Sequence, residues 1–568
     1  MKESYCDVLV IGGGAAGFSA AVTAAWHGKK VVLIEKSHLF GGATCWSGGW
    51  MWIPRNSLAR NAGIVEDIDQ PRLFLKNELK DKFSDKHIDM FLTTAPTMVD
   101  FFAQHTALQF EDGNKIADIH GKTAGAAEGG RSVIAAPYHG RHMGKLVKKM
   151  LSPKRETSFL GLPIMAGKDL WHFLKATRSF SSALYVAKRL GLHLLDLLIY
   201  RRTMRFANGS ALIARLAKSA EDLGVEIRTS TPAKSLIHEN DKVTGAIVKT
   251  ETGEEIIHAK NGIILAAGGF SYDIKRRASM VPHLSKDPFA HWPLPPSTNT
   301  GDTLNMAEVI GAEVSTDLAS AVAWCPVSVV PYKDGSTGIF PHIIDRGKPG
   351  VIAVLKNGKR FVNEGDGYYD YASAMDRETP EGEEVYSWLI CSHECQRRYG
   401  FGMTKPAPFS TKMWEENGYL KKAETIEALA QSCHIDPTQL RQTLDEYNKS
   451  AYDGKDPLFN RGSTPYNQKM GDPNHTPNPS IAPIDKGPFY AIKVLPGSFG
   501  TFAGLKTDEF ARVLHKTGTP IQGLYAVGTD MSSIMGGYYP TGGINLGPAM
   551  TFGYIAGCHI ANKKIENS

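Results

Sequence analysis

A glycine-rich turn between two short apolar runs, close to the N-terminus, restricts the fold more than any other feature. Residues 6–11 (CDVLVI) are typical of a buried strand, GGGAAG follows at 12–17, and an alanine-rich helical stretch covers 18–27. A second buried strand, KVVLIE, is expected at 30–35. Strand, turn, helix and strand in this order form a βαβ unit, which predicts an α/β protein with helices packed on a parallel sheet.

The glycines of this turn have the spacing of a dinucleotide-binding site. Gly12 allows the tight turn, Gly14 lets the backbone approach a pyrophosphate, and Gly17 lets the helix pack closely on the strand. The helix N-terminus offers amide donors and a partial positive charge to the phosphates. Glu35 ends the second strand, where its carboxylate can accept hydrogen bonds from ribose hydroxyls and disfavours a 2′-phosphate. A Rossmann-type dinucleotide site is therefore predicted.

Further turns of small residues favour FAD as the dinucleotide. One glycine fingerprint of this kind is present, which argues against separate FAD and NAD sites. A second glycine-rich loop, with hydroxyl side chains, follows Glu35 at 40–49. The segments AAGG at 266–269 and AVGTD at 526–530 each end an expected strand on small residues. These features are typical of flavoproteins whose FAD lies extended across the sheet, so we expect non-covalently bound FAD.

The chain length predicts more than one domain. A chain of 568 residues is too long for a single compact core. A proline-rich stretch at 285–296 marks a crossing into a second domain, and a run rich in Pro, Asn and Gly at 466–488 marks the return. We expect a Rossmann-type FAD-binding domain formed by 1–285 and 485–568, with an inserted α+β catalytic (capping) domain at 286–484.

Hydrophobic periodicity predicts several further elements. Antiparallel strands are expected at 225–228, 246–250 and 256–258, buried strands at 263–269 and 521–528, and helices at 423–433, 438–447 and 547–561.

Composition and charge exclude several classes of function. The formal net charge of +6 is small for this length and no basic run is present, so we expect no nucleic-acid partner. The seven cysteines are sparse and odd in number, which argues against a disulfide framework. Cys391, His393 and Cys395 lie close together in the sequence, but a metal site would need further ligands at comparable spacing, so no metal site is expected. The N-terminus lacks the pattern of a secretory signal, which predicts a cytoplasmic protein.

The most apolar segment, 184–200, is not a clean membrane span. Lys188, Arg189 and Asp196 interrupt it, so an amphipathic helix that covers the protein is expected. A weaker alternative is a patch that contacts a membrane surface, with a rim of basic side chains. The rim would consist of Arg201, Arg202 and Arg205.

The chain resembles, over nearly its whole length, the 3-ketosteroid dehydrogenases of the succinate dehydrogenase/fumarate reductase flavoprotein superfamily. The matching segments include GATCWSGGWMWIP at 42–54, GKRFVNE at 358–364 and MGGYYPTGGINLGPAMTFG at 535–553. The resemblance implies that FAD desaturates a ring next to a ketone. A base removes the α-proton, the β-hydrogen passes as a hydride to flavin N5, and a quinone-like acceptor then takes the electrons.

The same resemblance assigns the residues that stabilise the anionic carbonyl oxygen. In the family this is done by a tyrosine hydroxyl and, four residues later, a glycine amide, and these correspond to Tyr539 and Gly543. The amides that follow, at the start of the last helix, are expected over the flavin N1/O2 edge. The full set of expected FAD-binding residues is Gly12, Gly14, Ala15, Ala16, Gly17, Glu35, Lys36, Ser37, Gly42, Ala43, Thr44, Ser47, Gly48, Gly49, Ala233, Ala267, Gly268, Gly269, Asp302, Gly528, Asp530, Gly543, Ile544 and Leu546.

Two positions depart from the family pattern. The family base is a tyrosine, and the alignment puts Phe340, which cannot carry a proton, in its place. Near the segment 117–120 the family has an aromatic hydroxyl, and here His120 is the polar aromatic residue. His120 is therefore the third expected catalytic residue, as a proton relay near neutral pH.

Three alternatives remain beside a steroid substrate. A desaturase of a smaller cyclic ketone, of the cyclohexanone or 4-oxocyclohexanecarboxylate type, fits the altered proton-relay positions. A fumarate reductase-like enzyme is disfavoured, because Tyr368 stands where those enzymes carry an arginine proton donor. A flavin-binding protein without catalysis is disfavoured by the intact pair Tyr539 and Gly543. The oligomeric state does not follow from the sequence.

Overall fold

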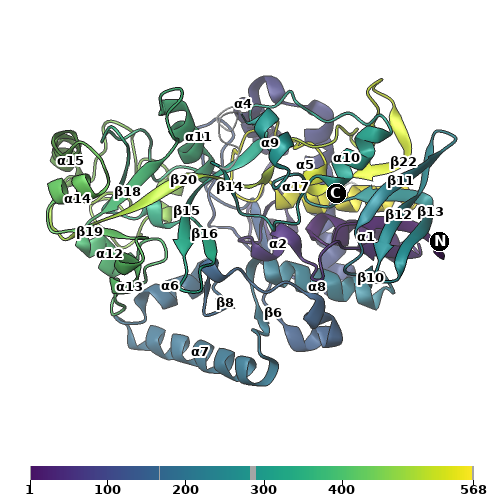
Figure 1. Ribbon diagram of the computed structural model, residues 1–568, viewed down its shortest axis with the longest axis horizontal. Coiled ribbons are helices and arrows are strands. Elements are labelled where there is room, and N and C mark those ends of the chain that lie inside the picture. The colour runs from purple at the N-terminus through teal and green to yellow at the C-terminus, as the bar shows by residue number, and fades with distance from the viewer. Residues whose placement is uncertain (1, 166, 282–289, 566–568) are drawn as a thin grey trace.

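The computed structural model describes residues 2–165, 167–281 and 290–565. Two large sheets lie at opposite ends of the molecule, with helices around each of them (Figure 1). The architecture is the mixed α/β fold predicted from the sequence. No helix among these residues is long and apolar enough to cross a membrane.

The first sheet contains the predicted βαβ unit. Its strands, in spatial order, are β10 (Glu226–Arg228), β2 (Val31–Ile34), β1 (Lys2–Ile11), β13 (Gly253–Leu265), β12 (Lys242–Thr250), β22 (Pro520–Ala526) and β21 (Arg512–Leu514), and β11 (Ala233–Glu239) also pairs with β12. The strand β1 runs parallel to both β2 and β13. The helices α1 (Ala15–Trp26) and α17 (Leu546–Ile560) pack on each other, and α5 (Asp85–His105) packs on α17.

Close packing of α1 on α17 depends on glycines. A Cβ atom at Gly553 would lie 2.7 Å from the carbonyl oxygen of Ala16, and one at Gly557 would lie 2.9 Å from that of Ala20. The two helices therefore approach at backbone contact. This packing sets the middle of α17 against the start of α1, and the segment before α17 lines the same cavity as the glycine turn after β1.

The second sheet is almost entirely antiparallel. Its main order is β16 (Thr337–Pro341), β15 (Val322–Pro331), β20 (Phe489–Thr501), β18 (Ser387–Cys391) and β17 (Val351–Leu355), and β14 (Trp292–Pro293) and β19 (Lys421–Ala423) pair with β20. The helices α11 (Tyr368–Glu378), α12 (His393–Tyr399), α13 (Lys412–Glu416), α14 (Ile426–Ser432) and α15 (Pro437–Ala451) lie around it (Figure 1). The side chain of Asp436 caps α15 by accepting hydrogen bonds from the amides of Thr438 and Gln439.

The remaining elements connect the two sheets or cover them. The helices are α2 (Gly42–Trp46), α3 (Ser57–Asn61), α4 (Asp69–Leu79), α6 (Lys168–Lys175), α7 (Phe180–Tyr200), α8 (Asn208–Asp222), α9 (Ile274–Met280), α10 (Asp302–Val309) and α16 (Pro465–Met470). The short strands are β3 (Trp50–Trp52), β4 (Phe110–Asp112), β5 (Ser132–Ala135), β6 (Tyr138–His139), β7 (Ser158–Phe159), β8 (Leu162–Pro163) and β9 (Arg205–Phe206).

One predicted strand pairing is wrong. The segment 225–228 was expected in an antiparallel set, but β10 pairs parallel with β2 at the edge of the first sheet. Its parallel direction follows from α8, which precedes it and supplies the crossover that a parallel strand needs. The antiparallel pairing expected for 246–250 and 256–258 is confirmed between β12 and β13.

The division into domains stays a prediction. The expected crossing at 285 falls in 282–289, outside the described residues. The strand β20 belongs to the second sheet, although it lies within the segment 485–568 that was assigned to the FAD-binding domain. The chain therefore rejoins the first sheet after Thr501.

Candidate active site

A single cavity of about 2370 Å³ extends from the glycine turn after β1 to the second sheet and to α6 and α7. Ordinary small-molecule sites measure roughly 300–1,000 Å³. The cavity is thus large enough for a dinucleotide and a second molecule. Its wall takes residues from both sheets, including Ile11 at the end of β1 and Phe340 on β16.

The glycine turn is closed on one side and open on the other. Gly12 has a φ of +119°, and a Cβ there would lie 2.2 Å from the carbonyl oxygen of Ala266. A Cβ at Gly17 would lie 2.0 Å from the carbonyl oxygen of Gly12. At Gly14 the nearest atom would be 3.9 Å away, and Gly14 lines the cavity. The backbone is therefore exposed to a ligand at the position where a pyrophosphate is expected.

The acidic residue at the end of β2 lies beside the same turn. The carboxylate of Glu35 accepts hydrogen bonds from the backbone amides of Gly13, at 3.0 Å, and Ser37, at 2.8 Å. Burial raises the pKa of Glu35, and these two amide donors oppose that shift. The ammonium group of the next residue, Lys36, binds the carboxylate of Asp302 at 2.7 Å. This contact joins the end of β2 to the start of α10.

Most of the expected FAD-binding residues line the cavity. The exceptions are Gly17, Asp530 and Ile544. The carboxylate of Asp530 is fully buried and accepts hydrogen bonds from the amides of Ala267, at 2.6 Å, and Gly269, at 2.8 Å. Asp530 therefore holds the turn at 266–269 in shape, whereas Gly17 serves the packing of α1 and Ile544 lies in the hydrophobic core.

Tyr539 and Gly543 line the cavity on the segment that leads into α17. The hydroxyl of Tyr368, the first residue of α11, donates a hydrogen bond of 2.7 Å to the hydroxyl oxygen of Tyr539. Both rings are buried, and they pack edge to face with centroids 4.9 Å apart. Burial raises the pKa of Tyr539, so its phenol stays protonated at neutral pH. Because Tyr368 donates to it, the proton of Tyr539 remains available for an acceptor in the cavity.

Tyr368 and Tyr466 are wall residues that the sequence did not identify as part of the site. Tyr466 lies on α16, and burial raises its pKa to about 12. The sequence clue to Tyr368 is its position, four residues after the GKRFVNE segment. In the sequence analysis this position served only as evidence against the arginine proton donor of a fumarate reductase-like enzyme. Phe340 lines the cavity, where its ring offers an apolar surface and no proton.

His120 does not fit the role of a proton relay. The cavity wall includes Ala117 but not His120. The ring nitrogens of His120 bind the carboxylates of Glu78, at 2.5 Å, and Asp370, at 3.0 Å. Burial lowers the pKa of His120, but these two hydrogen bonds outweigh it and raise the pKa to about 11. His120 is thus a fixed cation that ties α4 to α11 near neutral pH.

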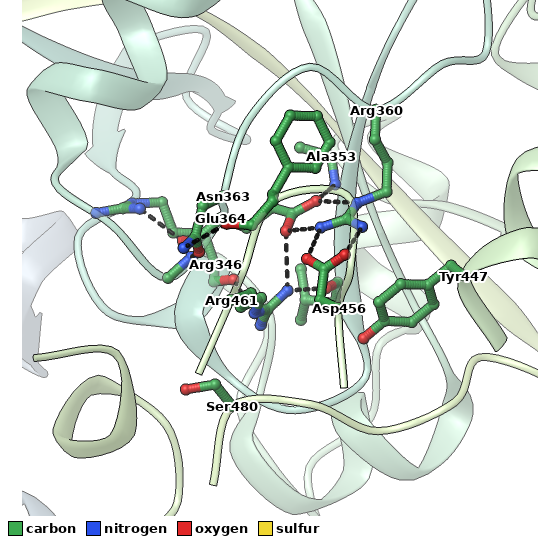
Figure 2. Close-up of polar contacts among 12 residues, drawn as sticks. Arg346, Ala353, Arg360, Asn363, Glu364, Tyr447, Asp456, Arg461 and Ser480 are labelled. Carbon is green, nitrogen blue, oxygen red and sulfur yellow. Dashed lines mark hydrogen bonds and ion pairs between the residues drawn. The ribbon is translucent and has the colours of Figure 1, made fainter. Parts of the chain in front are cut away.

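A buried network of charges holds the segment that leads into α11. Figure 2 shows Arg360 between the carboxylates of Glu364 and Asp456, with Arg461 on the other side of Glu364. The carboxylate of Glu364 also accepts a hydrogen bond of 2.9 Å from the amide of Ala353 on β17. All four charged side chains are at most 2% exposed. The network fixes the turn that sets the start of α11, and with it Tyr368.

Glu364→Gln is expected to lower the free energy of unfolding by about 3–5 kcal/mol, since removal of one partner leaves buried charges without compensation. Unfolding in denaturant measures the change. The matched control is Glu378→Gln, because Glu378 is half exposed and pairs with Arg377 at the surface. If the free energy of unfolding falls by less than about 1 kcal/mol, the largest value usual for an exposed ion pair, the buried network stabilises the fold no more than a surface pair does.

Comparison with known proteins agrees with this geometry. Residues 7–546 match the model of the family described as FAD binding domain. The chain is 38% identical to 4-oxocyclohex-2-ene-1-carboxylate 5-dehydrogenase of Sinomonas cyclohexanicum, over 99% of this chain and 94% of that protein. It is 32% identical to 3-oxosteroid 1-dehydrogenase of Mycolicibacterium smegmatis, over 99% and 98%.

A solved structure shares the whole fold. The 3-ketosteroid Δ1-dehydrogenase of Sterolibacterium denitrificans, solved with 1,4-androstadiene-3,17-dione, superposes with a TM-score of 0.91 at 33% identity, covering 99% of this chain and 100% of that one. The open turn at Gly14 and the carboxylate of Glu35 suit FAD, which the family binds. The chain belongs to the FAD-binding family that includes the 3-oxosteroid 1-dehydrogenases, and is an FAD-dependent dehydrogenase.

Proposed function

We propose that this enzyme introduces a carbon–carbon double bond next to the carbonyl group of a ring ketone. The observation that carries the proposal is the protonated, buried phenol of Tyr539, which lines the same cavity as the FAD-binding turn and stands four residues before Gly543. The names of the relatives support a ring ketone as the substrate class, since each name describes a substrate with an oxo group on a ring.

The proposed role of the pair is to bind the carbonyl oxygen. Loss of the α-proton leaves negative charge on this oxygen, and donors that are already oriented toward it stabilise the charge without reorganisation. Tyr539 would donate its hydroxyl proton and Gly543 its backbone amide. FAD, when bound, accepts the hydride from the β-carbon. Tyr368 would keep the hydroxyl of Tyr539 turned toward the substrate, because its own hydrogen bond occupies the oxygen of Tyr539 from the other side.

The size of the substrate separates two versions of the proposal. The resemblance to steroid dehydrogenases covers the whole chain, and the cavity continues past Phe340 to α6 and α7, which gives room for several rings. The change from a tyrosine to Phe340 and the higher identity to an enzyme named for a cyclohexene carboxylate favour a smaller ketone. As the electron acceptor we propose a quinone-like molecule, which can reoxidise the flavin after each turnover.

Anaerobic bleaching of the flavin absorbance tests the proposal. We expect a ring ketone to reduce the bound flavin, with either a 3-oxosteroid or a 4-oxocyclohexane carboxylate reacting fastest. A short-chain open ketone serves as the control that lacks the ring. Reoxidation of the reduced flavin by a soluble quinone analogue tests the acceptor in the same cuvette. The proposal fails if no ring ketone bleaches the flavin, or if fumarate reoxidises reduced enzyme faster than the quinone does.

A further inference from the structure

On the helix α7, polar side chains face the protein and apolar side chains face outward, which is the reverse of an ordinary surface helix. Its fully buried side chains are Ser182, His193 and Asp196, whereas six large apolar residues are each more than half exposed. These exposed residues, the α7 outer face, are Phe180, Leu184, Leu194, Leu195, Leu198 and Ile199. Helical periodicity places them on one side of the helix, as Phe180 and Leu184 near its start and a group of four near its end, with Ala187, Lys188 and Gly191 exposed between the two groups. Single exposed apolar side chains are ordinary, but several on one helix face mark an interaction surface.

Polar contacts on the inner side fix this orientation. The carboxylate of Asp196 pairs with Arg205 at 3.2 Å, and the Nε2 atom of His193 lies 2.9 Å from the carbonyl oxygen of Leu160. Nearer the N-terminal end, Arg189 pairs with Asp169 at 3.1 Å. A rotation of the helix that buried its apolar stripe would break all of these contacts. The apolar face is therefore held outward. Figure 1 shows α7 along the lower edge of the molecule.

The region around α7 accounts for the net positive charge of the chain. Residues 141–205 contain 14 lysines and arginines but only 3 acidic residues, a formal charge of +11, whereas the whole chain carries +6. The rest of the chain is therefore net negative. The three acidic side chains, Glu156, Asp169 and Asp196, are buried and paired with Lys154, Arg189 and Arg205. The charge that reaches the surface here is consequently basic.

Exposed basic residues lie beside the C-terminal end of α7. The guanidinium group of Arg141 lies 5.6 Å from the centre of the Tyr200 ring, and Lys145, Lys148 and Lys149 are exposed on the same short helical segment as Arg141. Of the three arginines expected from the sequence as a basic rim, only Arg201 is exposed. The other two face inward, because Arg202 donates to the carbonyl oxygens of Val147 and Met150 and Arg205 pairs with Asp196.

We propose that the α7 outer face docks on an anionic phospholipid bilayer. An apolar helix face flanked by basic side chains lies in the plane of such a surface, with its apolar side chains among the upper acyl chains and its cations near the phosphates. The positive charge around the stripe matches an anionic surface and would repel an equal face on a second copy of this chain. Tyr200 and Arg141, at the end of the helix, have the character of residues at the level of the headgroups.

Docking in this orientation would place the cavity next to the lipid. The inner side of α7 lines the cavity through Tyr185, Val186 and Leu190. An apolar ring ketone or a quinone dissolved in the bilayer could then enter without crossing water, a consequence that rests on the proposed function. The docking itself does not depend on the substrate.

Flotation of the FAD-loaded enzyme with lipid vesicles tests the docking. We expect binding to vesicles of phosphatidylcholine mixed with phosphatidylglycerol, weak binding to pure phosphatidylcholine, and release by salt. The double variant Leu194→Ser, Leu198→Ser should bind roughly tenfold more weakly or worse, because two side chains leave the lipid. The matched control, Val309→Ser with Leu458→Ser, removes apolar residues that are equally exposed elsewhere and should bind as the wild type does.

A charge-reversal variant tests the role of the basic side chains beside α7. Lys145→Glu, Lys148→Glu and Lys149→Glu together should abolish the preference for anionic vesicles. Flavin reduction by a water-soluble ketone should be unchanged in all of these variants, which separates failure of docking from failure of the proposed function. Equal vesicle binding by the wild type and the Leu194, Leu198 variant would overturn the proposal. A wild-type dimer in sedimentation that this variant loses, without vesicle binding, would assign the face to a second copy of the chain.

Discussion

Replacing Tyr539 with phenylalanine is expected to slow reduction of the flavin by a ring ketone roughly 10²–10³-fold, the usual cost of losing one donor to a developing oxyanion. The ring and its packing against Tyr368 remain, so the change removes only the hydroxyl. Anaerobic stopped-flow mixing of the oxidised enzyme with the ketone measures this step directly. Binding of the ketone should weaken much less than the rate, because the hydroxyl acts mainly in the transition state.

The neighbouring residue provides the control for this experiment. Tyr538 is a partly buried tyrosine that does not line the cavity, and Lys80 lies over its ring. Tyr538→Phe should therefore reduce the flavin at the wild-type rate. A single-turnover rate of Tyr539→Phe equal to that of Tyr538→Phe would remove the assigned role from the hydroxyl.

Gly12→Ala is expected to yield protein with about a tenth or less of the wild-type FAD content. A Cβ at this position would lie 2.2 Å from the carbonyl oxygen of Ala266, and the φ of +119° is one that other residues rarely adopt. Either the glycine turn or the segment at Ala266 that follows β13 must shift, and both line the cavity. The ratio of flavin absorbance to protein absorbance after purification measures the FAD content.

Gly28→Ala is the matched control for the cost of the backbone angle alone. Gly28 belongs to the same βαβ unit and has a φ of +78°, but a Cβ there would meet no atom within 4 Å. This variant should keep its FAD. Circular dichroism of Gly12→Ala distinguishes a folded apoprotein from an unfolded chain. Full FAD content in Gly12→Ala would mean that the close approach of the turn to Ala266 is not required.

The parts of the fold that the sequence predicted are local in origin. One βαβ unit contains the turn at 12–17, the helix after it and Glu35. Their spacing can therefore be recognised from the local sequence alone. The helix predicted at 438–447, which lies within α15, and the pairing of β12 with β13 are local as well. The pair of Tyr539 and Gly543 came from resemblance to a family rather than from any periodicity.

The parts that were missed depend on contacts between distant segments. The hydrogen bond between Tyr368 and Tyr539 joins residues 171 positions apart, and no spacing rule reports it. The carboxylates of Glu78 and Asp370 turn His120 from an expected relay into a fixed cation. Asp530 similarly holds a turn from inside the protein rather than touching the cavity.

A crystal structure of the enzyme with FAD and a bound ring ketone tests the central claim most directly. The account predicts the carbonyl oxygen within hydrogen-bonding distance of both the hydroxyl of Tyr539 and the backbone amide of Gly543, with the ring stacked over the flavin. A ketone bound with its carbonyl directed away from both groups, or a Tyr539 hydroxyl turned out of the cavity, would contradict it.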